Sequence, residues 1–433
     1  MERLRTYIDS FRGFEPDARR FLLVTLVMGA AGSLWWIDFN LYLAALGLSR
    51  STIGIISTVG AAASAAAALP ASAISDRVGR RLVMAGGAGL ATLALVLLDL
   101  TAAVPAIFLA AAAYSAGWSA LNVAQGPFLT EHSKPEHRSE LFALQFAIGT
   151  GTNIGAAVIG GVVAGAVADA IGLDPGGVGP YRVILLLMTA ALAGGLLILL
   201  TITRDRPPGG AHDGEGRPVS GSRFGITITN RSRFVRLVLP GFLISIGAGQ
   251  VLPFLNLFIQ GKFGLDLASL NVVFALTSLG TMLAVLFQPA IAKRLGRLPS
   301  VLLVQGVSIP FLVVLGFSPL LWTVIAAMTV RNSLMNAGNP IFFAFALDHV
   351  APSERATFSA VSALLWSAGW ALAGPWYSVL QANLGFDAGY AVNFATIIIL
   401  YTIATVLLWL WFRDAEPRPN RPLPAPAVPG ASA

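Results

Sequence analysis

One stretch of this chain has a similar counterpart later in the sequence. Residues 75–80 read SDRVGR, and residues 292–297, which lie 217 positions later, read AKRLGR. The same spacing of 217 relates residues 131–138 to residues 348–355, and residues 47–48 to residues 264–265. An ungapped offset that is kept in three places indicates that the chain consists of two copies of one structural unit.

The composition places both copies in a membrane. Of the 433 residues, 56% are hydrophobic and 11% are charged, whereas soluble domains carry about 25% charged residues. A spanning helix needs about 20 apolar residues. Such runs occur at 21–46, 52–74, 82–100, 104–129, 141–169, 181–203, 234–260, 270–292, 299–317, 320–346, 357–382 and 390–412. We therefore expect an all-α membrane protein with twelve transmembrane helices in two six-helix repeats. Because six is even, the repeats are parallel.

Basic residues predict the orientation in the membrane. Of 28 Lys and Arg residues, 24 fall in the termini and loops of one side, and only Arg50, Arg182 and Lys262 fall on the other. Since the positive side faces the cytoplasm, both termini are expected there, in a multi-pass protein of the plasma or inner cell membrane. The expected parts are a cytoplasmic arm (1–20), a six-helix bundle (21–203), a cytoplasmic linker (204–233), a second bundle (234–412) and a disordered tail (413–433).

The loop between the second and third spans carries a family signature. Residues 72–81, SAISDRVGRR, resemble the motif G-x-L-x-D-R-x-G-R-R/K of the major facilitator superfamily (MFS). With the twelve spans, the two repeats and the central linker, the resemblance covers almost the whole chain. It implies the MFS fold and a secondary transporter that works by alternating access. The chain departs from the motif at Ser72, where the family has glycine, and at Lys293, where the second copy lacks the acidic residue.

The resemblance also implies a gate on the cytoplasmic side. In the family, the acidic residue of the motif caps a facing helix and pairs with the arginines of the motif, which holds the outward-open state. A carboxylate is favourable at a helix N-terminus, and arginines balance its charge. The residues concerned are Asp76, Arg77, Gly79, Arg80 and Arg81. Further intracellular ion pairs are expected from Glu131, Arg138, Asp348 and Arg355. The alternative is that these residues only orient the loops and cap helices.

Two charged residues lie well inside predicted spans, where charges are costly and usually functional. Asp38 is in the first span and Arg331 is in the tenth. In the family, the first, fourth, seventh and tenth helices line the central cavity, so we expect both side chains to face it and to pair directly or through substrate. Asp38 is the best candidate for proton coupling, because it is the only carboxylate well inside a span. The alternatives are a structural ion pair and, for Asp38, a place at the outer interface.

Polar and aromatic residues on the same four spans predict the substrate site. Amides and hydroxyls beside aromatic rings suit a neutral or amphipathic organic solute, and Arg331 suits a carboxylate. The candidates are Trp35, Asn40, Tyr42, Tyr114, Trp118, Asn122, Gln125, Gln250, Asn256, Asn332, Asn336 and Asn339. For each amide, a hydrogen bond between helices is the competing interpretation.

These features predict a secondary active transporter that moves a small organic solute, is coupled to protons and acts as a monomer. A multidrug/proton antiporter is an alternative. The chain departs from the antiporter motif R-x-x-Q-G at Asn122, which replaces the arginine, and from G-x-x-x-G-P at Ala156, which replaces the proline. A non-transporting receptor or scaffold on the same fold is the alternative from another class. The direction of transport and the coupling ion stay open.

No enzyme chemistry is expected from this sequence. The chain has no cysteine, which excludes thiolate metal sites and cysteine nucleophiles. The pair Gly261-Lys262 is followed by Phe263, so it is not part of a phosphate-binding loop. We therefore expect no cofactor, no metal and no nucleic-acid partner, and we attribute the net charge of +7 to the loops that orient the helices in the lipid bilayer.

Overall fold

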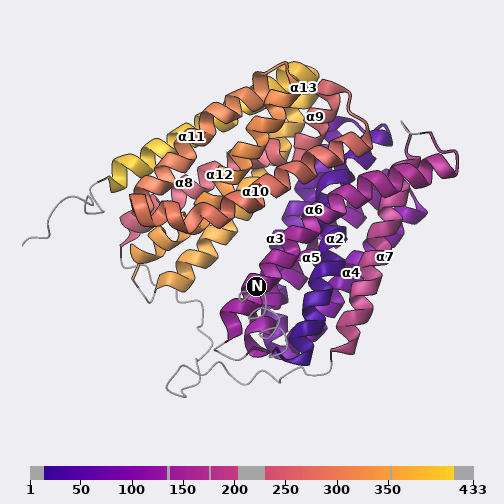
Figure 1. Cartoon of the computed structure of the whole chain (residues 1–433), viewed down its shortest axis with the longest axis horizontal. Helices are drawn as coiled ribbons and strands as arrows, with labels where there is room; N and C mark the ends of the chain where they lie inside the picture. The colour runs from indigo at the N-terminus through magenta and orange to yellow at the C-terminus, as the bar shows by residue number, and fades with distance from the viewer. Residues whose placement is uncertain (1–13, 134–136, 175–176, 203–229, 352–353, 414–433) are drawn as a thin grey trace, which may run out of the picture.

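The structure is a computed structural model that describes residues 14–133, 137–174, 177–202, 230–351 and 354–413. All regular structure in these residues is helical (Figure 1). Most of the expected arm, linker and tail lies outside the described residues, so these boundaries stay predictions.

The first bundle contains six helices, one for each of the first six predicted spans. They are α2 (Pro16–Ala45), α3 (Arg50–Val78), α4 (Arg80–Leu100), α5 (Val104–Glu131), α6 (Arg138–Ala170) and α7 (Gly179–Thr201). Local signals account for several helix starts. Ser49 Oγ accepts a hydrogen bond from the backbone N of Thr52 at the start of α3, as an N-cap serine does. The first turns of α2 and α5 contain Pro16 and Pro105, where the missing N–H leaves no helical bond unmade.

The second bundle contains the remaining six spans in a less regular form. Its elements are α8 (Arg231–Val251), the 3-10 helix η2 (Leu252–Phe254), α9 (Leu255–Phe263), α10 (Leu267–Leu295), α11 (Arg297–Phe317), α12 (Leu321–Asp348) and α13 (Arg355–Phe412). The predicted seventh span is thus broken at η2, where Pro253 has no N–H for an α-helical bond. The predicted eleventh and twelfth spans join in α13, at a non-helical Gly385 with φ 70° and ψ −161°.

The internal repeat is confirmed by the helix boundaries. Helices α10, α11 and α12 begin and end 217 positions after α3, α4 and α5, from Arg50 and Leu267 onward. The turns between them repeat as well. Gly47 and Gly264 have φ of 82° and 64°, and Gly79 and Gly296 have φ of 104° and 85°. Positive φ is readily adopted only by glycine, so these turns require the glycines that the sequence repeats.

The membrane-spanning character is visible in the helices themselves. Among the described residues, nine helical segments are long and apolar enough to cross a membrane, and α10 adds the shorter apolar stretch Leu267–Leu283. With α8, η2 and α9 taken as one span and α13 as two, the fold contains the twelve crossings that the sequence predicts.

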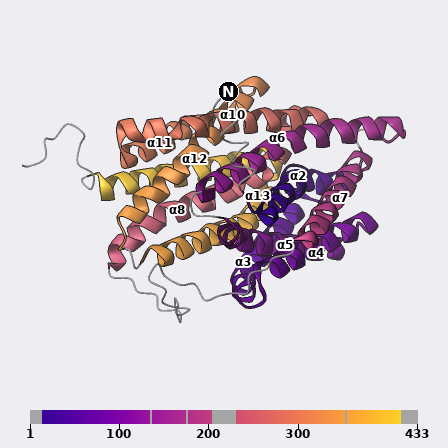
Figure 2. The ribbon, with the colours of Figure 1, turned by 60° about the horizontal axis from the view of Figure 1, so that its bottom comes forward.

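The two bundles lie side by side, and three pairs of helices make the most extensive contacts between them in the described part of the chain. Helix α3 packs against α13, α6 against α10, and α2 against α9. Figure 2 shows α6 and α10 running next to each other along this junction. We call the end that holds the last turns of α2 and α9 the closed end, because hydrogen bonds between the bundles gather there. The opposite end, with the turns at Gly79 and Gly296, is called the loop end, and the bundles diverge toward it (Figure 1).

Candidate functional site

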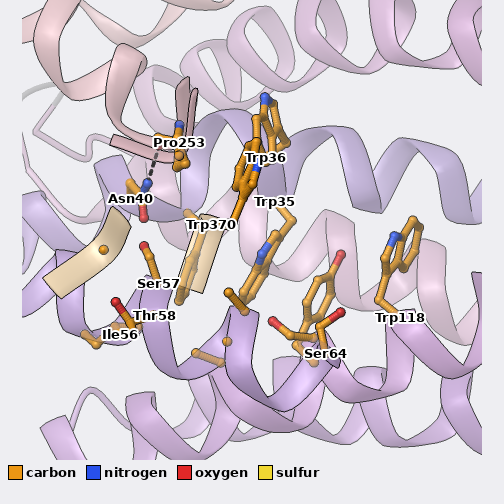
Figure 3. Close-up of a pocket in the computed structure, with 18 of the residues that line it drawn as sticks. Trp35, Trp36, Asn40, Ile56, Ser57, Thr58, Ser64, Trp118, Pro253 and Trp370 are labelled. Carbon is orange, nitrogen blue, oxygen red and sulfur yellow. Dashed lines mark hydrogen bonds between the residues drawn. The ribbon is translucent and has the colours of Figure 1, made fainter. Parts of the chain in front are cut away.

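A cavity of about 350 Å³ lies between the bundles (Figure 3). Its wall comes from α2, α3 and α5 of the first bundle and from α8, η2 and α13 of the second. The lining residues are Gly32, Trp35, Trp36, Phe39, Asn40, Ile56, Ser57, Thr58, Gly60, Ala61, Ser64, Ala111, Tyr114, Ser115, Trp118, Gly249, Pro253, Phe254, Trp370 and Gly374. Four predicted site residues, Trp35, Asn40, Tyr114 and Trp118, are therefore brought together here.

Parallel aromatic rings form one wall of the cavity. The ring of Trp35 has its centroid 3.7 Å from that of Phe39 and 3.7 Å from that of Tyr114. Tyr114 is in turn nearly parallel to Trp118, with centroids 6.0 Å apart and an interplanar angle of 7°. These two residues share a face of α5, because they are four positions apart. Gly32 makes room for the wall, since a Cβ there would lie 2.6 Å from the Trp118 ring.

The polar groups of the cavity are uncharged. Hydroxyl groups come from Ser57, Thr58, Ser64 and Ser115, and none of the lining residues is ionisable at neutral pH. The Tyr114 hydroxyl and the Trp370 Nε1 are buried and have no hydrogen-bond partner within the described part of the chain. A buried polar atom without a partner costs free energy, so a solute that reached either atom would gain a hydrogen bond that the protein does not make.

Two tryptophans of the cavity lie outside the predicted set. The rings of Trp36 on α2 and Trp370 on α13 have centroids 5.7 Å apart and enclose the side of the cavity nearest the second bundle (Figure 3). Sequence reasoning missed Trp370 because it searched the first, fourth, seventh and tenth spans, whereas Trp370 belongs to the eleventh. A tryptophan far from either end of an apolar run was the available signal, because interfacial tryptophans lie near span ends.

A reciprocal pair of asparagine bonds joins the bundles beside the cavity. Asn40 Nδ2 donates to the backbone O of Pro253 at 2.6 Å (Figure 3), and Asn256 Nδ2 donates to the backbone O of Ile37. Asn256 thus bonds the helix that carries Asn40, and Asn40 bonds η2, which directly precedes the helix that carries Asn256. We call these two bonds the asparagine clamp. Asn256 was predicted as a substrate ligand, and its amide instead holds the closed end together.

Asp38 lies in a separate contact between the bundles. Its side chain is 2% exposed, and its Oδ1 accepts a hydrogen bond from Asn271 Nδ2 of α10 at 2.9 Å. Asp38 does not line the cavity. Sequence reasoning missed Asn271, which lies one residue inside the predicted eighth span. The available signal in the sequence was an amide side chain within an otherwise apolar run.

Arg331 is buried in the second bundle and has its own partners. Its Nη2 donates to the hydroxyl of Tyr401 at 2.6 Å, and its Nη1 donates to Asn332 Oδ1 at 3.0 Å. The guanidinium carbon lies 5.5 Å from the centroid of the Tyr401 ring. Neither Arg331 nor Asp38 is part of an ion pair between described residues, and neither lines the cavity. The expected Asp38–Arg331 contact is therefore absent from this conformation, because Arg331 faces α13 and Asp38 faces α10.

The remaining predicted ligands do not line the cavity. On α5, Gln125 donates to Asn122 and accepts from Gln145 of α6, so these amides bond helices of one bundle. On α12, Asn336 donates to the backbone O of Asn332. Tyr42 and Gln250 are buried, and Asn339 is exposed.

Equivalent ion pairs form in the two bundles at the loop end. Arg80 pairs with Asp76 and with Glu131, whose Oε1 is 3.1 Å from Arg80 Nε. Arg297 pairs with Asp348; these residues lie 217 positions after Arg80 and Glu131. In this conformation the ion pairs connect helices of one bundle, and Asp76 contacts Arg80 of its own bundle.

The other predicted gate residues hold helix ends. Arg138 Nη2 donates to the backbone O of Thr130 at 3.4 Å, and Arg355 Nε donates to the backbone O of Leu347 at 3.2 Å. These two bonds also repeat after 217 positions. Arg81 Nη2 donates to the backbone O of Leu200 at 2.7 Å, Arg77 is exposed, and Gly79 forms the turn between α3 and α4.

Comparisons with known proteins agree with this architecture. The profile of the Major Facilitator Superfamily matches residues 21–375. One similar structure is a bacterial homolog of the human lysosomal transporter Spinster, inward-facing and occupied, with 16% identity, a TM-score of 0.71, and 92% of this chain and 96% of that chain covered. Another is the nucleoside transporter NupG, with 14% identity, a TM-score of 0.68, and 93% and 100% covered. A third is the D-xylose-proton symporter, with 12% identity, a TM-score of 0.69, and 90% and 97% covered. No curated protein sequence gives a significant match. The chain therefore belongs to the Major Facilitator Superfamily, as a multi-pass membrane transporter of small solutes.

Proposed function

We propose that this transporter moves a small organic solute that is uncharged or amphipathic and has a flat ring. The observation that carries the proposal is the cavity lining, which combines the rings of Trp35, Tyr114 and Trp118 with serine and threonine hydroxyl groups and contains no charged residue. Aromatic faces stack on flat rings, and a few polar groups in an apolar pocket fix the orientation of a ligand.

An uncharged solute is favoured over an anionic one. The guanidinium of Arg331 is bonded to Tyr401 and Asn332 and does not line the cavity. A carboxylate in the cavity would therefore be desolvated without a cationic partner, which is costly.

Alternating access follows from the position of the cavity. The solute would lie between the two bundles, and the asparagine clamp joins the bundles beside it. Release of the clamp, with new contacts at the loop end, would expose the cavity to the other side of the membrane. Asn40 links the two events, because it lines the cavity and also bonds Pro253 of the second bundle.

Proton coupling is proposed for Asp38. Its carboxyl is buried between α2 and α10, which belong to different bundles. Its surroundings therefore change whenever the bundles move, and an intramembrane carboxyl with this property can bind a proton in one conformation and release it in the other.

A proton-driven drug antiporter is the second candidate. The row of aromatic rings also suits apolar compounds of unrelated structure, because stacking demands only a flat face. The two candidates differ in selectivity: a solute transporter is inhibited by analogues of one compound, and a drug antiporter by compounds that share no scaffold.

The test begins with a thermal-shift screen of the purified protein against sugars, nucleosides, amino acids, organic anions and drugs. Hits are then followed as flux into proteoliposomes with and without a pH gradient. Trp35→Ala should weaken binding of a hit at least tenfold, whereas Trp322→Ala, which removes a tryptophan that is 77% exposed on α12, should leave it unchanged. Arg331→Ala should not abolish binding. A solute that binds but never crosses the membrane would support a receptor instead.

A further inference from the structure

Two buried oxygen atoms in the contact between Asp38 and Asn271 have no hydrogen-bond partner among the residues that the structure describes. Asp38 Oδ1 and Asn271 Nδ2 are bonded at 2.9 Å, whereas Asp38 Oδ2 and Asn271 Oδ1 are both buried and unbonded. The two side chains are 2% and 0% exposed. Each side chain therefore has one hydrogen-bonded atom and one acceptor oxygen that receives no hydrogen bond. One additional hydrogen between these two oxygens would complete the bonding of the pair.

Helix α6 seals this contact without supplying a donor. A Cβ on Gly160 would lie 3.9 Å from Asp38 Oδ2, and a Cβ on Gly161 would lie 2.7 Å from the Cβ of Asn271. The glycines let the α6 backbone approach closely, and a helical backbone in mid-span has no free N–H to offer.

The charged and titratable groups of the neighbouring helices are engaged elsewhere. The Tyr181 hydroxyl of α7 accepts a hydrogen bond from Gln260, and within the described part of the chain Asp38 Oδ2 receives no hydrogen bond from it. Lys262 of α9 donates to the backbone O of Gly316. At the start of α3, the Arg50 guanidinium lies over the ring of Phe386.

The groups around α10 are likewise occupied. Asp266 accepts from the backbone N of Ser269 in the first turn of α10, and Arg331 of the adjacent α12 bonds Tyr401. Within the described part of the chain, no Lys, Arg or His forms an ion pair with Asp38. The missing donor is therefore not supplied by a neighbouring cation.

We propose that Asp38 and Asn271 together form a proton-binding site. In the closed-end conformation, a proton taken from water forms an O–H bond on Asp38 Oδ2, and this hydroxyl donates to Asn271 Oδ1, while Asn271 Nδ2 donates to Asp38 Oδ1. The acid and the amide then make two hydrogen bonds, and both orphan oxygens are satisfied. The proposal deepens the proton coupling proposed above and rests on it.

The site couples the proton to bundle movement, because α2 and α10 lie in different bundles. With the proton, the pair holds the bundles together through two bonds. Without it, an ionised carboxylate is left buried with a single neutral donor, which is unfavourable. Separation of α2 and α10 hydrates that carboxylate, and the proton returns to water. Low pH therefore favours the conformation in which the closed end is shut, and high pH favours the conformation in which it is open.

The test uses pulsed EPR distances in lipid nanodiscs without any solute. The chain has no cysteine, so spin labels go only where they are introduced, at Leu100→Cys with Leu320→Cys for the closed end and at Leu82→Cys with Pro299→Cys for the loop end. As the pH rises from 5 to 9, the ratio of open to shut closed ends should increase by up to about tenfold per pH unit, as for one linked proton.

Four variants identify the pair. Asp38→Asn supplies a permanent N–H donor and should keep the closed end shut at every pH. Asn271→Leu removes both hydrogen bonds of the proposed pair and should lower the population of the shut closed end at pH 5, where the pair would otherwise be protonated. The exchange Asp38→Asn with Asn271→Asp rebuilds an acid–amide pair and should restore the response. Thr277→Val is the matched control, because this buried α10 hydroxyl bonds its own helix at Val273 O, and it should respond like the unmodified protein.

Three results would overturn the proposal, and they distinguish the failure of proton coupling from the failure of the acid–amide pair. A pH-independent distance in the unmodified protein would remove both this site and the proton coupling, while binding of a solute in the cavity would remain testable by thermal shift. An unchanged population of the shut closed end at pH 5 in the folded Asn271→Leu variant, or no pH response in the folded exchange variant, would remove the acid–amide pair alone. Folding is checked by size-exclusion profile and circular dichroism.

Discussion

In Tyr114, we expect the ring to serve packing and the hydroxyl oxygen to serve solute binding. Its ring stacks on Trp35, whereas its buried hydroxyl has no partner in the described part of the chain. Tyr114→Phe removes no internal hydrogen bond, so thermal stability should stay within about 0.5 kcal/mol. The affinity for the solute should fall about three- to tenfold, the value of one neutral hydrogen bond, in a tryptophan-fluorescence titration.

The matched control is Tyr42→Phe. Tyr42 also has a buried hydroxyl without a partner among the described residues, but it does not line the cavity. This variant should keep the affinity of the unmodified protein, and an equal loss in both variants would contradict a role for the Tyr114 hydroxyl in binding.

The sequence predicted correctly which residues share a face where that depends on a single helix. Tyr114 and Trp118 share a face by their spacing alone, and both line the cavity. Arg331 shows the limit. Its depth in the span follows from the sequence, but the side on which it meets another helix depends on how α12 is rotated against α13. Because α12 is apolar on most sides, its sequence pattern does not determine this rotation.

The break in the seventh span matters at the scale of elements, because it exposes backbone acceptors. Pro253 lies in η2, and its carbonyl accepts the Asn40 bond of the asparagine clamp. Asn40→Leu or Asn256→Leu removes one bond between the bundles, worth about 0.5–1.5 kcal/mol. Each change should therefore raise the ratio of open to shut closed ends about two- to tenfold, measured by the EPR distance between labels at positions 100 and 320.

Asn383→Leu serves as the control for the clamp. This exposed amide donates to the backbone O of Val379 within its own helix, so its loss should leave the distance distribution unchanged. A clamp variant that behaves like this control would show that the two bonds do not hold the closed end.

The contact between α6 and α10 depends on a small residue. A Cβ on Gly161 would meet Asn271 Cβ at 2.7 Å and Ala268 Cα at 3.2 Å, whereas a Cβ on Gly155 of the same helix would meet nothing within 4 Å. Gly161→Val should destabilise the shut closed end by about 1–3 kcal/mol, as overpacking does, and Gly155→Val should not. Equal EPR distance distributions for the two variants would show that this contact tolerates bulk.

At the same scale, the sequence predicted the helices better than their interruptions. The spans in α3, α4 and α5 and their copies follow from uniform apolar runs. The 3-10 turn at η2 was not predicted, because Pro253 sits in an unbroken apolar run and bilayer helices often tolerate proline. Gly385 was predicted to lie in a loop, whereas the helix resumes directly after it. This joint depends on the backbone conformation of one residue, which the composition of the sequence does not predict.

For the molecule as a whole, the balance between conformations should respond to Asp76. In the family, the acidic residue at this position holds the state in which the loop end is shut. Asp76→Asn should therefore favour the conformation described here, with the closed end joined. A surface pair contributes about 0.2–1 kcal/mol, so the population ratio should change by up to about fivefold, read from the distance between labels at positions 82 and 299.

The control for this change is Glu140→Gln. Glu140 pairs with His137 at the same end of the same bundle, so it matches Asp76 in charge and location without belonging to the loop motif. Unchanged distances in Asp76→Asn, or equal changes in both variants, would contradict a gate role for Asp76.

The joint at Gly385 has a mechanical consequence for the whole transporter. Before this residue, α13 touches the other bundle, where Ser378 Oγ donates to the backbone O of Ser51. After it, Phe394 and Ile397 pack against Gly316 and Gly247 of their own bundle. A connection with one non-helical residue has no slack to absorb a displacement. We therefore expect a displacement of α3 against the first arm of α13 to be passed across Gly385 to the second arm.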